Sequence, residues 1–167
     1  MDNMKDEISD FLKFAYEHGQ IKEVSDAIKE YPPIEEWHQG KIENVIKESS
    51  VIYGSKYGIG DIVFVKEYGY SDGTKGINHL FVIIDRNNLV VPIENFCMLI
   101  SSQMNKLKYA SNKSLPKDDN NHLNRDSIVK TDVLYKIIDD QILFKVGEVD
   151  YQKIKEYKNY YYEINKK

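Results

Sequence analysis

The sequence predicts an α+β protein with a small, strongly curved antiparallel sheet or barrel, a C-terminal helix and an N-terminal helical extension. Apolar residues recur with a helical period of 3.6 in the first 50 residues and again near the C-terminus. A turn-rich stretch with three glycines follows at 53–60, and beyond it the apolar runs are short and β-branched. The second part leaves little room for helical crossovers between parallel strands, which favours antiparallel pairing.

Composition is that of an ordinary globular protein. Of the 167 residues, 41% are hydrophobic and 30% are charged. The single cysteine, Cys97, excludes a disulfide framework and a cysteine-based zinc site within one chain. The sequence has no apolar run of about 18 residues, and the acidic N-terminus lacks an apolar core. We therefore expect no membrane association, no signal peptide and a cytoplasmic protein.

Charge divides the chain at the same turn-rich boundary. Residues 1–56 carry 7 Lys and 12 Asp or Glu, a net charge of −5. Residues 57–167 carry the other 16 basic and 15 acidic residues, a net charge of +1, so this part does not repel a nucleic acid. We expect two units, a helical extension at 1–56 and a sheet domain at 57–167.

The extension contains three stretches with helical periodicity. Residues 4–16 place apolar side chains on one helix face, and 20–31 repeat the pattern after Gly19. Pro32 and Pro33 end the second helix and begin a third at about 33–49. No catalytic pattern is visible in this part of the sequence.

The sheet domain contains several short β-rich runs. They are separated by a glycine-containing loop at 67–77, a turn at 86–88 and a long polar loop at 111–124. Asp150 is a typical N-cap residue for a last helix that carries Tyr151, Ile154 and Tyr157. We expect strands at 61–66, 79–85, 89–94 and 141–146, with a further short strand at 107–109.

A stretch at 127–137 carries the strongest chemical signal. Lys130 and Asp132 follow a β-branched pair, and residues two apart in a strand point to one face. A cation and a carboxylate on one rigid face can bind a phosphate and move a proton. The alternative is an exposed ion pair, which is common on sheet surfaces and stabilises little.

Familiar enzyme motifs are absent. Gly58-Ile59-Gly60 precedes a strand rather than a helix, so it is not a dinucleotide fingerprint. The sequence has no phosphate-binding loop, no G-x-S-x-G motif and no histidine pair with metal-ligand spacing. We therefore expect no metal site and no cofactor.

Three short motifs occur in a recognisable order. They are Gly60-Asp61-Ile62-Val63, Asp126-Ser127-Ile128-Val129 and Val146-Gly147, with the run Gly76-Ile77-Asn78-His79 between the first two. In this order they resemble the MazF/PemK family of toxin ribonucleases from bacterial toxin–antitoxin systems. The likeness covers about residues 57–163.

The resemblance implies an SH3-like sheet, a homodimer and cleavage of single-stranded mRNA without a metal. In that reaction the ribose 2′-OH attacks the adjacent phosphate and leaves a cyclic phosphate and a 5′-OH. Such cleavage needs a base, an acid and a cation near the phosphate. The resemblance also implies an antitoxin as protein partner.

The family's site residues carry over in part. Lys130 and Asp132 occupy the positions of an Arg and an Asp in PemK-type toxins. Asn78 replaces the Arg of a Gly-x-Arg-Pro run, and Glu94 replaces a Thr. His79 lies beside the replaced Arg and has a pKa range suited to proton transfer, with Glu94 as a further base or as the group that orients His79. We expect Lys130, Asp132, His79 and Glu94 to be catalytic.

An RNA-binding groove is expected beside these residues. Its candidates are Lys75, Asn78, Lys106 and Lys108, whereas His122 in the long loop is expected on the surface. The alternative interpretation for each lysine is a solvated side chain without a ligand.

Two further possibilities follow from the departures and the charge asymmetry. The first is an inactive module on the same scaffold that binds RNA, DNA or a protein, either an antitoxin or a gyrase-type target, because fold alone does not determine function. The second is that residues 1–56 cover the RNA groove through their negative charge. A stabilising helical cap is the simpler role for that extension.

Overall fold

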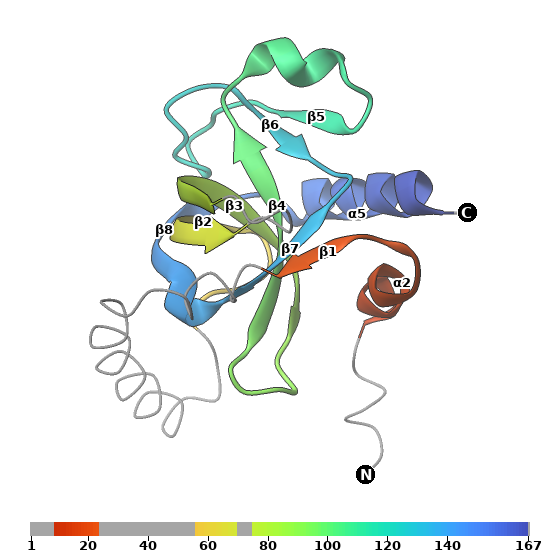
Figure 1. The fold of residues 1–167 in the computed structure, drawn as a ribbon. Helices are drawn as coiled ribbons and strands as arrows, with labels where there is room; N and C mark the ends of the chain where they lie inside the picture. The colour runs from red at the N-terminus through yellow and green to blue at the C-terminus, as the bar shows by residue number, and fades with distance from the viewer. Residues whose placement is uncertain (1–8, 24–55, 70–74, 167) are drawn as a thin grey trace.

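The computed structural model describes residues 9–23, 56–69 and 75–166 (Figure 1). Strands dominate this part of the chain, with one α-helix near each end of the described range. In chain order the elements are α2 (Asp10–His18), β1 (Ile21–Glu23), β2 (Asp61–Gly69), β3 (Lys75–Asn87), β4 (Glu94–Ser101), the 3-10 helix η1 (Met104–Lys108), β5 (Asn112–Leu115), β6 (Ser127–Lys130), β7 (Leu134–Ile138), the 3-10 turn η2 (Asp139–Gln141), β8 (Ile142–Glu148) and α5 (Tyr151–Asn165).

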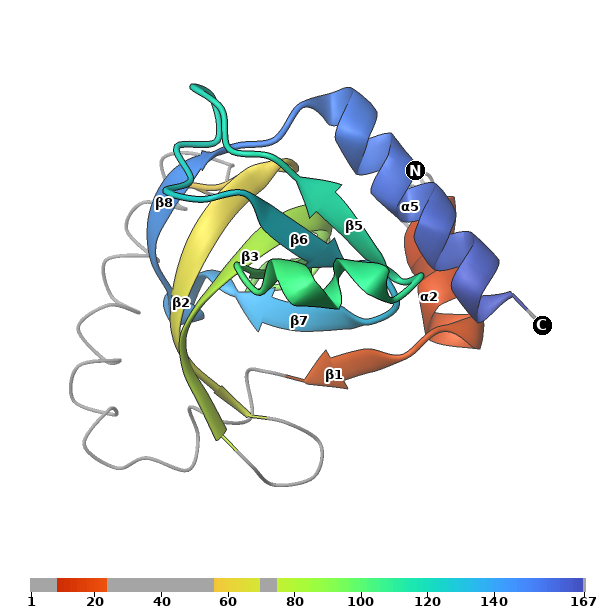
Figure 2. The same cartoon turned by 90° about the horizontal axis from the view of Figure 1, so that it is seen from above.

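The strands form one mixed sheet. Its main order is β1-β7-β4-β3-β2-β8, and β6 pairs with both β4 and β5. Among the described strands, β1 and β7 are parallel and the other pairs are antiparallel. The sheet curls strongly, and α2 and α5 lie together on one side of it (Figure 2). This confirms the prediction of an α+β fold with a mostly antiparallel sheet and a C-terminal helix.

The helices cover one face of the sheet. Phe11, Leu12 and Ala15 of α2 and Ile154 and Tyr161 of α5 are buried in a cluster with the apolar side chains of that face. Full burial of a Phe, Leu or Ile side chain contributes about 1.5–3 kcal/mol. The predicted periodicity of both helices therefore corresponds to this buried face.

A second cluster lies on the opposite face of the sheet. β4 contributes to both clusters, and the six residues from Asn95 to Ile100 are all buried. A strand covered on both faces is apolar along its length rather than alternating. The buried members of this cluster are Val63, Val65, Phe81, Ile83, Cys97, Leu99, Tyr135, Ile137 and Ile142.

The described part of the N-terminal extension belongs to the main core. Ser9 caps α2 by accepting a hydrogen bond from the Leu12 amide, and its hydroxyl donates to Asp85 of β3 at 2.6 Å. Residues 21–23 form β1, so the predicted helix at 20–31 is wrong at its start because these residues pair with β7. The predicted third helix at 33–49 lies outside the described residues.

Three local predictions in the sheet domain are also wrong. The strand returning from β3 is 94–101 rather than 89–94, since Pro92 has no N–H to donate to a ladder. Residues 107–109 belong to η1 and its C-cap rather than to a strand. The polar loop at 111–124 contains β5, whose polar residues pair with β6.

The motifs that carry the family resemblance lie at turns and close contacts. Gly60 has φ +94°, which favours glycine, and the Asp61 carboxylate accepts a hydrogen bond from the Gly58 amide at 2.8 Å. A Cβ on Gly147 would collide with the backbone carbonyl of Asn121. These motifs therefore determine how strands begin and how the long loop packs.

Candidate functional site

Lys130 and Asp132 do not share a strand face. β6 ends at Lys130, because the amide and the hydroxyl of Thr131 both donate to the Ser111 carbonyl, at 2.9 and 2.7 Å. Val129 packs in the cluster on the helix-covered face, and Val133 packs against the cluster on the opposite face. Side chains four residues apart in one continuous strand would share a face, so the strand alternation is interrupted between these two residues. The predicted side-by-side arrangement is therefore wrong. The structure describes no ion pair between Lys130 and Asp132 either.

His79 and Lys130 come from different strands to one end of the sheet. β3 pairs Leu80 with Ile100 of β4, and β4 pairs Ile100 with Val129 of β6. His79 and Lys130 are the neighbours of these paired residues, on strands separated by β4. His79 precedes Leu80 whereas Lys130 follows Val129, so the two positions are also offset by two residues along the strands. At about 4.8 Å per strand and about 3.3 Å per residue, their backbones lie about 12 Å apart across β4.

The environment of His79 favours the neutral imidazole. Burial lowers the pKa of His79 most, and the charge of Lys130 lowers it further. Hydrogen bonds with the backbone of Leu80 and of Ile100 raise the pKa, but the balance is a lowered value. A neutral imidazole beside an ammonium group can accept a proton while the cation holds a phosphate.

Asp132 lies in the connection between β6 and β7. It is half-buried, and its backbone carbonyl accepts a hydrogen bond from the Asn165 side chain of α5 at 3.2 Å. Its carboxylate accepts no hydrogen bond from the residues that the structure describes. Asp132 is therefore close to Lys130 in the sequence. The described contacts include none between Asp132 and His79.

Asn78 has an unusual backbone. It is exposed and has φ +52°, a left-handed conformation that asparagine tolerates better than most residues. This conformation occurs inside β3, directly before His79. Lys75 is the first residue of the same strand and lies about 13 Å from His79, at about 3.3 Å per residue. Its side chain lies outside the described part of the chain.

Lys106 and Lys108 lie at the same end of the sheet as Lys130. Asn112 pairs with Lys130 across β5 and β6, and its side chain donates to the Lys106 carbonyl at 2.9 Å. Lys106 is half-buried and Lys108 is exposed. The structure thus places three of the predicted cations, Lys130, Lys106 and Lys108, around η1, which Figure 1 shows at the top of the sheet.

Glu94 lies at the other end of the β3–β4 pair. It pairs with Asn87, eight residues along β3 from His79, which corresponds to about 25 Å. Its carboxylate binds Lys136 at 3.3 Å and accepts from Asn87 at 3.4 Å. The interpretation in which Glu94 orients His79 or acts as a base beside it is therefore wrong, since two strands with an antiparallel register cannot bring these positions together.

Ser101 lies next to the candidate site, and the sequence did not indicate it. β4 pairs Ile100 with Leu80, so Ser101 is the next residue of β4 at the end where His79 precedes Leu80 along β3. Its hydroxyl accepts a hydrogen bond from the Gln103 amide at 3.2 Å. No local pattern marks this serine, because its position beside His79 comes only from the strand register.

The remaining candidate groups do not add to this site. His122 is exposed with φ +55°, as expected for a loop residue on the surface. Burial raises the pKa of the Cys97 thiol, which disfavours the thiolate. In residues 9–23, 56–69 and 75–166, no group of three His, Cys, Asp or Glu side chains has a metal-binding arrangement.

Comparisons with known proteins leave the family open. No family model and no curated protein matches the chain. In the described part of the chain, no helix has the length and apolarity needed to cross a membrane.

Proposed function

We propose that this chain is a divergent MazF/PemK-like endoribonuclease with an SH3-like fold that cleaves single-stranded mRNA without a metal. The observation that supports it most is the placement of a neutral imidazole, His79, and a cation, Lys130, at one end of one sheet. Both residues belong to the sequence runs that carry the family resemblance.

The chemistry divides between the two side chains. His79 accepts the proton of the attacking 2′-OH, and Lys130 stabilises the charge that develops on the phosphate. The imidazolium then returns the proton to the leaving 5′ oxygen, so that the ends are a cyclic phosphate and a 5′-OH. Asp132, in the adjacent connection, is a second acid or base candidate once RNA orders the site.

The partners follow from the same proposal. The chain acts as a homodimer in the cytoplasm, needs no cofactor and is held inactive by an antitoxin protein. Inhibition in cis by the acidic residues 1–56 is a variant of this regulation, and most of that segment lies outside the described residues. Removal of the segment also removes α2 from the core, so its role in regulation needs charge substitutions rather than a deletion.

A cleavage assay tests the proposal. Purified protein is incubated with a long single-stranded RNA in EDTA, together with the variants His79→Ala and Asp132→Ala. Loss of the general base is expected to lower kcat/KM by about 10²–10⁴. Glu94→Ala is the matched control, since it removes a remote carboxylate and is expected to keep the wild-type rate.

A binding module without catalysis is the second candidate function. It is favoured by the position of Glu94, because the sheet separates one of the expected proton-transfer groups from His79. Such a module binds a nucleic acid, an antitoxin or a gyrase-type target without cutting RNA. Absence of cleavage by the wild-type protein, with RNA affinity retained, would establish this candidate instead.

A further inference from the structure

The segment from the end of β4 to the end of β5 has an unusual composition for this protein. Residues 101–115 contain three lysines and no Asp or Glu, whereas the whole chain has a net charge of −4. The segment is therefore locally basic in an acidic chain, and we call η1, which carries Lys106 and Lys108, together with Tyr109 the basic patch. Clustered lysines of this kind attract phosphate groups through their charge.

The same segment exposes apolar side chains. Met104 is 37%, Leu107 39% and Tyr109 55% exposed, on or directly after η1. Lys108 extends over the Tyr109 ring, with its ammonium nitrogen 5.5 Å from the ring centroid. Proteins bind single-stranded nucleic acids with exposed aromatic rings that stack on bases and with nearby lysines that contact phosphates.

Backbone hydrogen bonds fix Tyr109 relative to the candidate site. Its amide donates to the Lys106 carbonyl at 3.1 Å, and its carbonyl accepts from the Asn112 amide at 3.0 Å. Asn112 is paired with Lys130 across β5 and β6. The backbone of Tyr109 is therefore held next to β5, the strand that pairs with Lys130.

We infer that Tyr109 is a base-stacking platform for single-stranded RNA and that Lys106 and Lys108 bind the flanking phosphates. This inference rests on the proposed function, since it gives the RNA a path from Lys130 over η1. The contact is made through the face of a base, so it tolerates different bases and sets affinity rather than the cleavage motif.

A second tyrosine offers a matched control. Tyr151 of α5 is 63% exposed, and Lys155 lies 5.7 Å from its ring centroid. The local sequence differs, because residues 147–157 contain three acidic residues and two lysines. Tyr151 therefore has the same aromatic and cationic pair without the basic surroundings.

The test measures binding without cleavage. A short fluorescein-labelled oligouridine is titrated with full-length protein in the His79→Ala background, and fluorescence anisotropy gives Kd. Tyr109→Ala is expected to weaken binding about tenfold, a loss within the range for one stacked base. Tyr109→Phe is expected to keep the affinity because the ring remains, and Tyr151→Ala is expected to change nothing. Lys108→Ala is expected to lower the slope of log Kd against log salt by about 0.7.

Several outcomes would overturn the inference. Equal Kd values for Tyr109→Ala and Tyr151→Ala, or an equal loss for Tyr109→Phe and Tyr109→Ala, exclude stacking. Tighter binding of oligodeoxyuridine excludes RNA as the preferred ligand. A change of molar mass for Tyr109→Ala in light scattering, with unchanged RNA affinity, assigns the patch to contacts between copies of the chain.

The same measurements separate the two proposals. If wild type binds RNA through Tyr109 but does not cleave it, the stacking inference stands and the proposed function fails. If wild type cleaves RNA and Tyr109→Ala keeps the wild-type Kd, the function stands and the stacking inference fails.

Discussion

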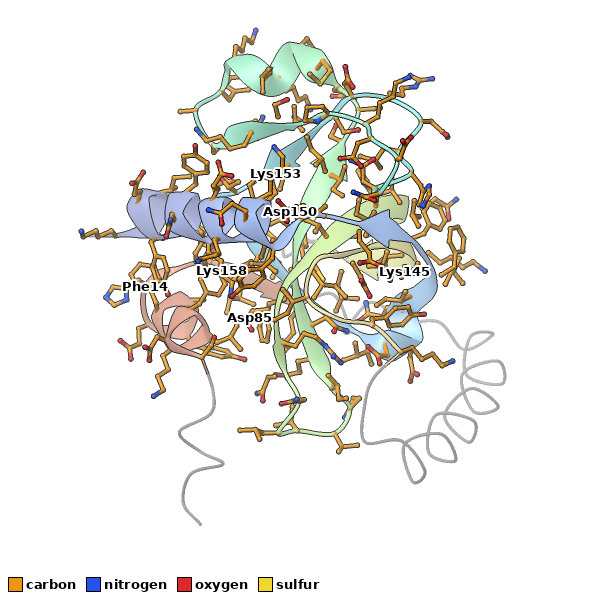
Figure 3. All side chains as sticks on the ribbon, turned by 180° about the vertical axis from the view of Figure 1, so that it is seen from behind. Phe14, Asp85, Lys145, Asp150, Lys153 and Lys158 are labelled. Atoms are coloured by element: carbon orange, nitrogen blue, oxygen red, sulfur yellow. The ribbon has the colours of Figure 1, made fainter. Side chains whose placement is uncertain are left out.

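The two ends of the β3–β4 pair differ in how their charged side chains are used. At the hairpin end, around Asn87 and Glu94, carboxylates have partners: Glu94 binds Lys136 at 3.3 Å, and Asp85 binds Lys158 at 3.3 Å. Asp85 and Lys158 are labelled in Figure 3, on β3 and on α5. At the η1 end, around His79 and Lys130, the ammonium group of Lys130 forms no ion pair with any described carboxylate.

The hairpin end is also connected through side-chain amides. Arg86 donates to Asn95 at 2.9 Å, and Asn95 donates to Asp139 at 2.8 Å. The exception in the described part of this network is one buried guanidinium nitrogen of Arg86, which has no partner. Buried charges are retained where they are paired, whereas a cation held ready at a sheet end is suited to an anionic ligand. The hairpin end therefore has a structural role, and the ammonium group at the η1 end, unpaired within the described residues, is consistent with the phosphate-binding role that we propose for it.

The largest expected difference is between two lysines. Lys130→Ala is expected to lower RNA cleavage by about 10²–10³, since it removes one stabilising charge from the transition state, and to leave the free energy of unfolding nearly unchanged. Lys136→Ala is expected to keep the cleavage rate and to lose about 1 kcal/mol of stability through its pair with Glu94. Cleavage rates and urea unfolding of both variants check this. Loss of cleavage in Lys136→Ala, or a purely structural effect of Lys130→Ala, would remove the distinction between the ends.

The next effect concerns stability at Asp85. Asp85 is 5% exposed. Its carboxylate accepts a hydrogen bond from Ser9, the N-cap of α2, and forms an ion pair with Lys158 of α5. Asp85→Ala leaves a largely buried ammonium group without its partner, so we expect a loss of about 2–3 kcal/mol in urea unfolding. Ser9→Ala is the smaller companion change, with about 1 kcal/mol lost at the helix cap. A result in which Ser9→Ala costs more than Asp85→Ala would contradict this account of the network.

The smallest expected effect is a pH dependence at His79. Its pKa is lowered from 6.5, so between the lowered value and 6.5 the unfolded chain binds more protons than the folded chain. The contribution of His79 to stability therefore rises with pH through this window and is lost as pH falls. His79→Gln is expected to flatten that part of the stability profile.

An NMR titration sharpens the same point. Because the charge of Lys130 lowers the pKa of His79, Lys130→Ala is expected to raise the titration midpoint of the His79 ring. Lys136→Ala is the control and is expected to leave the midpoint unchanged. A midpoint that responds equally to both variants would show that no specific coupling exists.

The elements with strong local signals were predictable from the sequence. The periodicity of α2 and α5 and the β-branched runs of β2, β6 and β8 correspond to observed elements. β1 was not predictable, because its residues have helical periodicity and their strand conformation comes from pairing with β7. The polar strand β5 was missed for a similar reason, since its partner β6 supplies the pattern.

The candidate site was predictable only where short sequence motifs marked its residues. Lys130 and His79 were selected from short motifs, and the sheet brings them to one end. Glu94 was assigned to the wrong end, because the β3–β4 turn at 88–93 shifts it away from His79. Ser101 could not be found, since only the pairing of β3 with β4 brings it to the end of the sheet where His79 lies.

The chemistry of the RNA ends tests the central claim most directly. A single-stranded RNA is cleaved by the wild-type protein in EDTA, and mass spectrometry identifies the new termini. The account predicts a 2′,3′-cyclic phosphate and a 5′-OH, and no cleavage at a site whose ribose lacks the 2′-OH. Products with a 3′-OH and a 5′-phosphate, or no cleavage in EDTA, would contradict it.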